Sequence, residues 1–206
     1  LNLANALRIA GRWEAALAEV RAAKSSLPPN APAEAREQAA LAEGTLLEEL
    51  GRPQEAVALY QAETRTPNLL FNLASALNKA GRLDDAEAAL EEALAKAPGF
   101  APAWGNLAGI RLKRGRLAEA AEACRRGLEA APREVILQLG LGNALYRLKD
   151  YEAAAEAFRR SLALRPELPD GHAGLVNALA KAGKRDEALA AAEAAAALPE
   201  PPPRLL

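Results

Sequence analysis

A cysteine and a histidine that lie together can carry nucleophilic catalysis, with the thiolate attacking and the imidazole moving the proton. This chain has one residue of each kind, Cys124 and His172. It has no metal-ligand spacing, no phosphate-binding glycine loop and no nucleophile elbow. Neighbouring acids such as Glu48 and Glu49 point about 100° apart around a helix, so they cannot act as a carboxylate pair. We therefore expect no catalytic residue, no metal site and no cofactor.

Two other sets of polar residues recur along the chain and have the chemistry of binding. The first consists of four asparagines: Asn72, Asn106, Asn143 and Asn177. A carboxamide offers a donor and an acceptor, so it can pair with the peptide unit of an extended ligand. The second consists of four basic residues spaced 34 residues apart: Lys79, Lys113, Arg147 and Lys181. They could form a rail for an acidic peptide, or they could simply favour the negative C-terminal ends of helices.

The spacing of 34 residues also runs through the framework that must position these side chains. It separates Pro98, Pro132 and Pro166, then Leu73, Leu107, Leu141 and Leu175, then Ala86, Ala120, Ala154 and Ala188. At 3.6 residues per turn, residues 101–134 predict two short amphipathic helices with Gly115 at the turn between them. The alanine series also includes Ala16 and Ala56, and it predicts that the paired helices approach closely. Such fixed-period similarity indicates a repeat architecture.

This unit resembles the tetratricopeptide repeat, a helix–turn–helix of the same period. An aromatic residue, a Leu and a small residue on the first helix, Gly at the turn, Ala on the second helix and a closing Pro all fall in phase. The resemblance covers nearly the whole chain. It implies an all-α, right-handed α-solenoid of about six helix pairs, with a concave groove that binds other proteins.

The predicted repeats differ in regularity. Their ranges are 1–27 (a truncated first repeat), 33–66, 67–100, 101–134, 135–168 and 169–198, followed by a proline-rich tail at 199–206. The loop around Pro28 and Pro29 carries an insertion of about six residues, because Gly51 follows Gly11 by 40 residues. The second helix of repeat two should end early, near Thr64. In repeat five, Lys149 and Asp150 stand where other repeats have Gly-Arg or Gly-Lys.

The repeat alignment separates the two residues that could have reacted together. Cys124 shares a position with Val20, Tyr60, Leu90 and Phe158, so we expect it to be a small buried hydrophobic residue. His172 takes the position of Trp104 and is expected to pack at a helix start. The two lie on different helices, two repeats apart, and should not meet.

The resemblance implies that one face of every first helix lines the groove. The residues that it places there are Phe71, Asn72, Ser75, Lys79, Asn106, Gly109, Lys113, Asn143, Tyr146, Arg147, Asn177 and Lys181. Gly105, Gly140 and Gly174 fall on the same face, and we expect these three glycines and Gly109 to leave room for a ligand backbone. The two-carboxylate clamp of the family's chaperone-binding members cannot be placed, because Phe71, Ser75 and Leu139 occupy or adjoin its positions.

Composition limits the partners. The 206 residues include 26 Lys and Arg against 27 Asp and Glu, a net charge of −1, which gives no support to a nucleic-acid binder.

No apolar run approaches the roughly 20 residues needed to cross a bilayer. One cysteine excludes an internal disulfide. No signal peptide is visible, so we expect a cytoplasmic protein, although the chain begins inside a helix and a preceding signal or anchor is possible. The abundance of Arg, Ala, Gly and Pro hints at a bacterial source.

The sequence thus predicts a non-catalytic scaffold or adaptor that binds an extended peptide or a helix, acidic if the basic rail is used. Two alternatives stay open. The chain could be the substrate-recruiting region of a larger enzyme, such as a transferase. It could instead be a structural protein that self-associates through open ends, since its last helix is Ala-rich and lacks a polar outer face.

Overall fold

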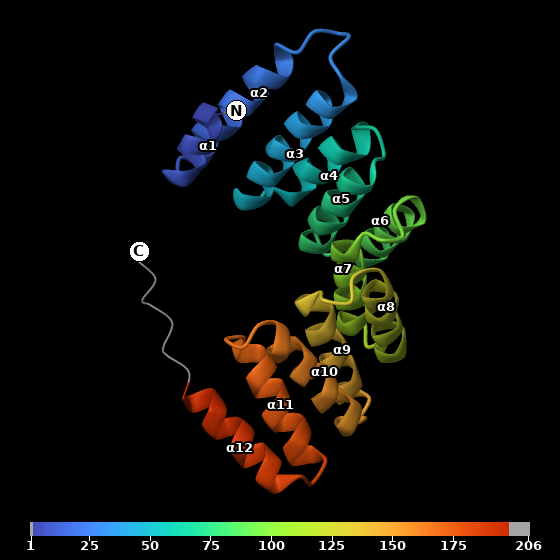
Figure 1. Ribbon diagram of the computed structural model, residues 1–206. Coiled ribbons are helices and arrows are strands. Elements are labelled where there is room, and N and C mark those ends of the chain that lie inside the picture. Colours follow the sequence, from blue (N-terminus) through green and yellow to red (C-terminus); the bar gives the residue numbers. More distant parts are fainter. Residues whose placement is uncertain (1, 198–206) are drawn as a thin grey trace. The chain divides into compact units, whose positions relative to one another are not determined.

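The periodic pattern folds into a succession of α-helices. The computed structural model describes residues 2–197, and within this range it contains twelve helices (Figure 1). They are α1 (Asn2–Ile9), α2 (Trp13–Ser25), α3 (Ala33–Glu49), α4 (Pro53–Ala62), α5 (Pro67–Lys79), α6 (Leu83–Lys96), α7 (Ala101–Lys113), α8 (Leu117–Ala130), α9 (Val135–Arg147), α10 (Tyr151–Leu164), α11 (Pro169–Lys181) and α12 (Arg185–Ala196). The predicted proline-rich tail at 199–206 lies outside the described residues.

The helices form six pairs, which confirms the predicted all-α fold of stacked helix hairpins. The chain divides after Pro98 into two compact blocks, and we call residues 2–98 the N-terminal block and residues 99–197 the C-terminal block. Within each block every helix contacts the next one. The first helices of neighbouring pairs also touch: α3 with α5, α7 with α9, and α9 with α11. Their outer faces therefore lie next to one another, as a binding surface on first helices requires.

A residue with a left-handed backbone conformation ends the first helix of each pair. Gly11, Gly51, Gly81, Gly115 and Gly183 have φ between 70° and 79°. At α7 the Gly115 amide donates to the Leu112 carbonyl at 3.1 Å, and the Arg116 amide donates to the Arg111 carbonyl at 2.9 Å. This is the Schellman arrangement, which favours glycine because a Cβ is strained at positive φ.

Lys149 takes this left-handed position at the end of α9, with a φ of 65°. Its amide donates to the Tyr146 carbonyl, and the Asp150 amide donates to the Leu145 carbonyl, both at 3.0 Å. The end of α9 therefore keeps the Schellman hydrogen bonds, although the positive φ strains the backbone of Lys149. Lys149→Gly is expected to raise the unfolding free energy by about 0.5–1 kcal/mol in urea denaturation. The reverse change, Gly115→Lys, is the matched control and should lower stability; unchanged stability in both variants would contradict the assignment of strain.

Side-chain size is complementary across the helix pairs. Residues 16 apart along the chain occupy equivalent places on the two helices of a pair: Ala4–Val20, Gly44–Tyr60, Ala74–Leu90, Ala108–Cys124, Gly142–Phe158 and Val176–Ala192. The two aromatic residues are thus matched with glycine. A Cβ added at Gly44 would lie 2.1 Å from the Tyr60 ring, and one at Gly142 would lie 2.7 Å from the Phe158 ring. These rings fill the space that a larger residue would need.

The buried alanines and the irregular second repeat also follow the predicted pattern. Ala16, Ala56, Ala86, Ala120 and Ala154 are fully buried and Ala188 of the last pair is 8% exposed, as the predicted close approach of the paired helices requires. The insertion appears as a long loop between α2 and α3, and α4 is only ten residues long. The chain then re-enters a helix at α5, where the Thr66 hydroxyl accepts a hydrogen bond from the Leu69 amide at 3.2 Å.

Candidate functional site

A pocket of about 370 Å³ opens in the C-terminal block between two first helices. It is lined by Asn143 and Tyr146 of α9, Phe158 of α10, and Asp170, Ala173, Gly174 and Asn177 of α11. We call it the α9–α11 pocket. On α11 these residues follow a spacing of three, four and seven, which places them on one helix face. Its volume falls within the usual range for ligand sites, about 300–1,000 Å³.

Phe158 forms the floor of the α9–α11 pocket and is 1% exposed. A Cβ added at Gly174 would lie 2.5 Å from its ring, and one at Gly140 would lie 3.1 Å from the Cys124 sulfur. These two glycines therefore make room for side chains of the preceding second helices, while Gly174 also lines the pocket, and the expectation that they leave space for a ligand stays a prediction. Gly109 on α7 differs, because no atom lies within 4 Å of its added Cβ.

The polar groups of the pocket are available to a ligand. Asn143 and Asn177 are exposed, and their side chains make no hydrogen bond within residues 2–197. The Tyr146 ring is half-buried and packs edge-on against Tyr151, with ring centroids 5.5 Å apart. The arrangement presents two carboxamides and a supported aromatic ring at one opening.

The four predicted asparagines do not form one row. Asn72 and Asn106 lie nine residues before their turn glycines, whereas Asn177 lies six residues before Gly183 and Asn143 six before Lys149. Asn106 is exposed on α7. In the N-terminal block, Asn72 donates its amide to the Asn68 carbonyl at 2.8 Å within α5. The α9–α11 pocket thus brings together only Asn143 and Asn177.

Lys79 and Arg147 of the basic series have the following partners inside the protein. In the N-terminal block the Lys79 ammonium lies 2.9 Å from the Glu48 carboxylate, and the Ser75 hydroxyl donates to the same group at 3.0 Å. In the C-terminal block Arg147 donates to the Leu112 carbonyl near the end of α7 at 2.7 Å. Such contacts fit the alternative that these cations favour helix C-termini and neighbouring repeats.

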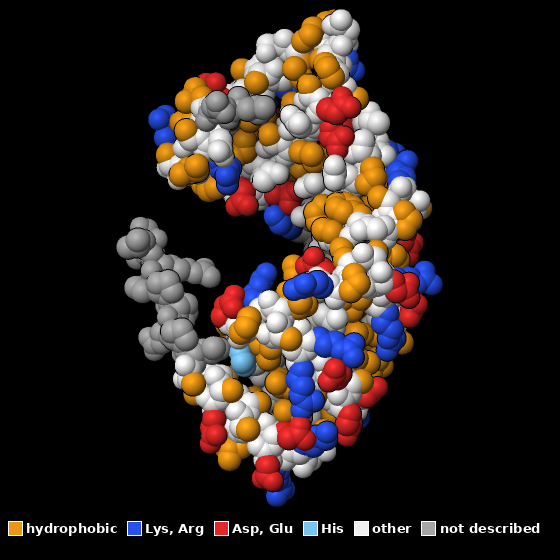
Figure 2. All heavy atoms as spheres, in the orientation of Figure 1, with side chains coloured by type: hydrophobic (Ala, Val, Ile, Leu, Met, Phe, Trp, Pro, Cys, Tyr) orange, Lys and Arg blue, Asp and Glu red, His pale blue; other side chains and the backbone are white. Residues whose placement is uncertain are grey.

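The other predicted groove residues lie as follows. Phe71 is half-buried on α5, and Lys113 and Lys181 are exposed at the ends of α7 and α11. Figure 2 shows Lys and Arg interspersed with Asp and Glu over the visible face of the C-terminal block, without a basic stripe there.

Cys124 and His172 do not meet. Cys124 is buried on α8, and burial raises the pKa of its thiol to about 12, so the thiol is neutral near pH 7. His172 lies on α11, where its Nε2 is 2.7 Å from the Pro166 carbonyl oxygen. Helices α8 and α11 share no contact within the described residues. This confirms the expected separation.

Residues 2–197 contain neither a metal-binding cluster nor a helix that could cross a membrane. No group of three or more His, Cys, Asp or Glu side chains lies close enough to hold a metal ion. None of the helices described here combines the length and the apolar character that crossing a membrane requires.

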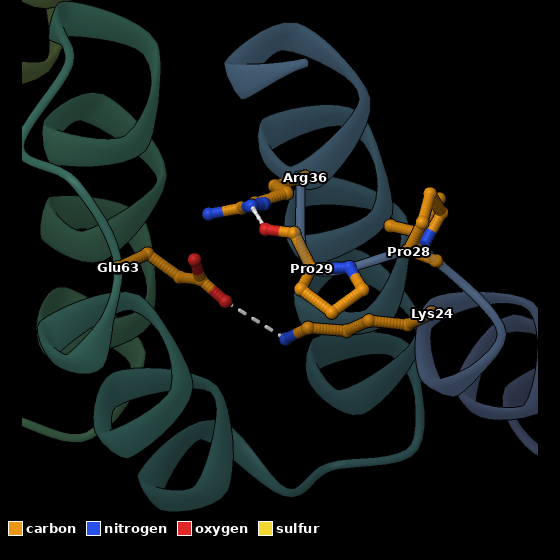
Figure 3. Close-up of a pocket in the computed structure, with 6 residues that line it drawn as sticks. Lys24, Pro28, Pro29, Arg36 and Glu63 are labelled. Atoms are coloured by element: carbon orange, nitrogen blue, oxygen red, sulfur yellow. Dashed lines mark hydrogen bonds and ion pairs between the residues drawn. The ribbon is translucent and has the colours of Figure 1, made fainter. Parts of the chain in front are cut away.

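The N-terminal block has a polar pocket of about 360 Å³ beside the inserted loop (Figure 3). The Lys24 ammonium lies 2.9 Å from the Glu63 carboxylate, and Arg36 donates to the Pro29 carbonyl. These charged and polar groups thus bind one another across the pocket. We interpret the pocket as a by-product of the loop, held in shape by internal contacts.

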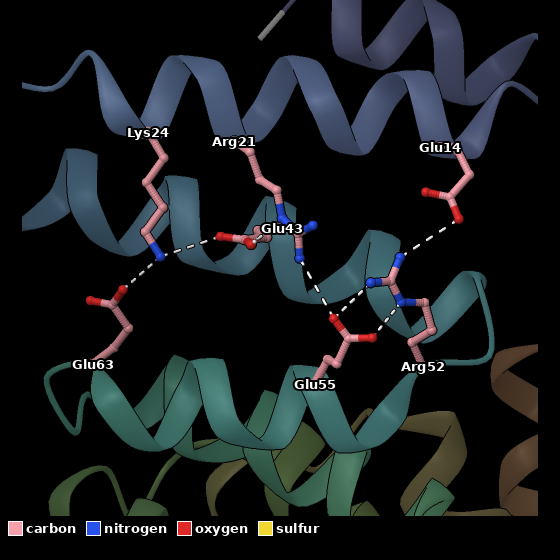
Figure 4. A network of polar contacts seen from close by, with 7 residues as sticks. All are labelled: Glu14, Arg21, Lys24, Glu43, Arg52, Glu55 and Glu63. Carbon is pink, nitrogen blue, oxygen red and sulfur yellow. Dashed lines mark hydrogen bonds and ion pairs between the residues drawn. The ribbon is translucent and has the colours of Figure 1, made fainter.

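The same region carries an ion-pair network that joins α2, α3 and α4 (Figure 4). Glu43 of α3 is 7% exposed and lies 2.8 Å from Arg21 and 3.3 Å from Lys24, both on α2. At the other end Arg52 lies 2.5 Å from Glu55. A buried carboxylate needs such partners, because removing one leaves an uncompensated charge. The network is therefore structural, and it helps to hold the repeats together around the insertion.

Comparison with known families decides the classification. Models described as tetratricopeptide repeat match residues 77–141, 136–168 and 169–194, which together span more than half of the chain. The chain belongs to the tetratricopeptide repeat family. No curated protein matches it significantly in sequence.

Solved structures with a similar fold include several of MamA. A structure of MamA from Desulfovibrio magneticus RS-1 is 20% identical with a TM-score of 0.68, and the match covers 77% of this chain and 92% of that one. MamA AMB-1 is 25% identical with a TM-score of 0.64, covering 75% and 94%. The MamA RS-1 ArsTM double mutant is 20% identical with a TM-score of 0.67, covering 74% and 88%.

Asp170 is a polar residue of the pocket that the sequence pattern does not single out. Asp170 in the first turn of α11 looks like an ordinary helix-start acid, which favours the positive end of the helix. The signal that could have identified it is its spacing, because it precedes Asn177 by seven residues and so shares its face.

Proposed function

We propose that this protein is a non-catalytic interaction module that binds an extended segment of another protein on the first helices of its C-terminal block. The observation that carries the proposal is the α9–α11 pocket, where Asn143, Tyr146 and Asn177 meet. The open face at Gly109 on α7 offers a further place for close approach of a backbone.

The chemistry of the pocket suits a peptide. Each carboxamide can donate to a peptide carbonyl and accept from a peptide N–H. A net hydrogen bond contributes about 0.5–1.5 kcal/mol. Tyr146 adds apolar contact area together with a hydroxyl, a combination that is enriched at binding hot spots. The acidic peptide that a basic rail would favour has less support, because Lys79 and Arg147 have internal partners.

The test is selection of peptides from a displayed library of random dodecapeptides. Asn143→Ala combined with Asn177→Ala is expected to weaken binding of wild-type-selected peptides about tenfold, since two hydrogen bonds are lost. Both residues are exposed, so the fold should be unchanged. Fluorescence anisotropy with the synthetic peptides gives the affinities.

The matched control changes an exposed pair on a second helix. Glu156→Ala with Arg160→Ala removes an ion pair of 3.0 Å on α10, away from the pocket lining. This variant should bind the peptides as the wild type does. If selection yields no peptide, or if the asparagine variant binds equally well, the proposal fails.

A second candidate is self-association, favoured by exposed apolar residues in each block. Ile9 on α1 is 75% exposed and Leu189 on α12 is 62% exposed. Exposed apolar surface of this kind can mark a contact site when it forms a patch. Static light scattering across a concentration series should then show a rising mass, and Leu189→Lys should lower it. A constant monomer mass would remove this candidate.

A further inference from the structure

The charge that the described residues bring to the α9–α11 pocket is acidic. Among the lining residues within 2–197, Asp170 is the only charged one. Its side chain makes no ion pair or hydrogen bond within residues 2–197. The pocket thus presents an exposed carboxylate beside two carboxamide oxygens that can also accept hydrogen bonds.

Arg147, Arg159 and Lys181 have partners or positions that keep them from compensating the Asp170 carboxylate. On α9, Arg147 donates to the Leu112 carbonyl. On α10, Arg159 is paired with Glu187 of α12 at 2.5 Å. On α11, Lys181 lies eleven residues after Asp170, a distance of about 16 Å along the helix axis. The negative charge of the pocket is therefore available to a ligand.

The walls of the pocket suit the stem of a long basic side chain. The half-buried Tyr146 presents aromatic surface, the buried Phe158 closes the floor, and Ala173 and Gly174 add no bulk on the α11 side. Lys and Arg bury their methylene stems against apolar surface while the charged head stays polar. A cation within about 6 Å of an aromatic ring gains further attraction. An acidic side chain would meet a like charge instead.

We propose that the α9–α11 pocket binds a Lys or Arg side chain of the partner peptide, with Asp170 as its counter-ion and Asn143 and Asn177 as additional acceptors. This inference rests on the proposed function, because it assigns the chemistry of a residue within the peptide. It makes Asp170 a specificity-determining residue, in addition to any effect that it has on the helix dipole of α11.

The experiment uses the same random dodecapeptide library on wild type and on three variants of the full chain. Wild type is expected to enrich peptides with a recurrent Lys or Arg. Asp170→Asn should lower the affinity of those peptides about fivefold at low salt, the upper range for an exposed ion pair. Asp170→Lys should shift the selection towards Asp or Glu at that position. Added salt should reduce the difference between wild type and Asp170→Asn.

The matched control is Asp186→Asn, which removes an exposed acid from the first turn of α12, outside the pocket. It loses the same kind of helix-dipole contribution, but it should leave peptide affinity unchanged. If Asp186→Asn weakens binding as much as Asp170→Asn does, the effect comes through the fold and the inference is overturned.

Two further outcomes separate this inference from the proposed function. If the selected peptides depend on Asn143 and Asn177 but lack a basic residue, or bind Asp170→Asn equally well, the inference is overturned and the proposed function stands. If no peptide is enriched, or if binding is independent of both asparagines, the proposed function fails and the inference fails with it.

Discussion

Phe158→Ala is expected to lower the unfolding free energy by about 3–5 kcal/mol, the usual range for removing a fully buried aromatic side chain. The ring is 1% exposed and lies within a hydrophobic cluster with Leu145, Leu162 and Leu175. It also fills the space left by Gly142 and Gly174, whose added Cβ atoms would approach it within 2.7 Å and 2.5 Å. These two glycines belong to α9 and α11, so the cavity would lie between two repeats.

Urea denaturation measures the effect, and Phe158→Leu is the matched control. Leucine occupies the same place at Leu90 in another repeat, so this change keeps most of the apolar volume and should cost clearly less. A loss of under about 1 kcal/mol for Phe158→Ala would be far below the range for a buried aromatic residue. It would contradict the assignment of Phe158 to the core that links α9, α10 and α11.

Gly44→Ala is expected to destabilise the N-terminal block by about 1–3 kcal/mol or more, because one added methyl group overpacks the pair. The added Cβ would lie 2.1 Å from the Tyr60 ring, and Tyr60 is only 2% exposed. The ring cannot move outward without exposing itself or displacing its neighbours on α3. Thermal and urea denaturation both report this loss.

The decisive comparison is the double variant Gly44→Ala with Tyr60→Leu. It recreates the Ala74–Leu90 pair that the chain already uses in α5 and α6. We expect the double variant to recover much of the stability lost by Gly44→Ala, so the two changes should be strongly non-additive. If the losses in unfolding free energy of the two single variants simply add up in the double variant, residues 44 and 60 do not compete for the same space in the core.

Much of the fold was predictable because it depends on local chemistry repeated at a fixed period. The turn glycines predict the ends of the first helices, and Lys149 stands in the same left-handed place as Gly115. The early end of α4 follows from the short interval between Gly51 and Gly81. These features need only the spacing of residues along the chain.

The contacts of the groove face were harder to predict, because they depend on side chains from the preceding repeat. Gly174 looked like open surface, but the Phe158 ring packs against it. Lys79 looked like part of a rail, but Glu48 of α3 pairs with it. Periodicity predicts which face a residue occupies, whereas the partner on that face depends on residues that do not repeat.

The most direct measurement of the central claim is to locate a bound peptide on the protein. A 15N-labelled sample is titrated with the dodecapeptide most enriched by selection, and chemical-shift changes are followed by NMR. We expect the largest changes at the side-chain amides of Asn143 and Asn177 and at the backbone amide of Gly174, with saturation at the affinity found by anisotropy. Changes confined to the exposed faces of α8, α10 or α12, with these three signals unmoved, would contradict a binding site on the first helices.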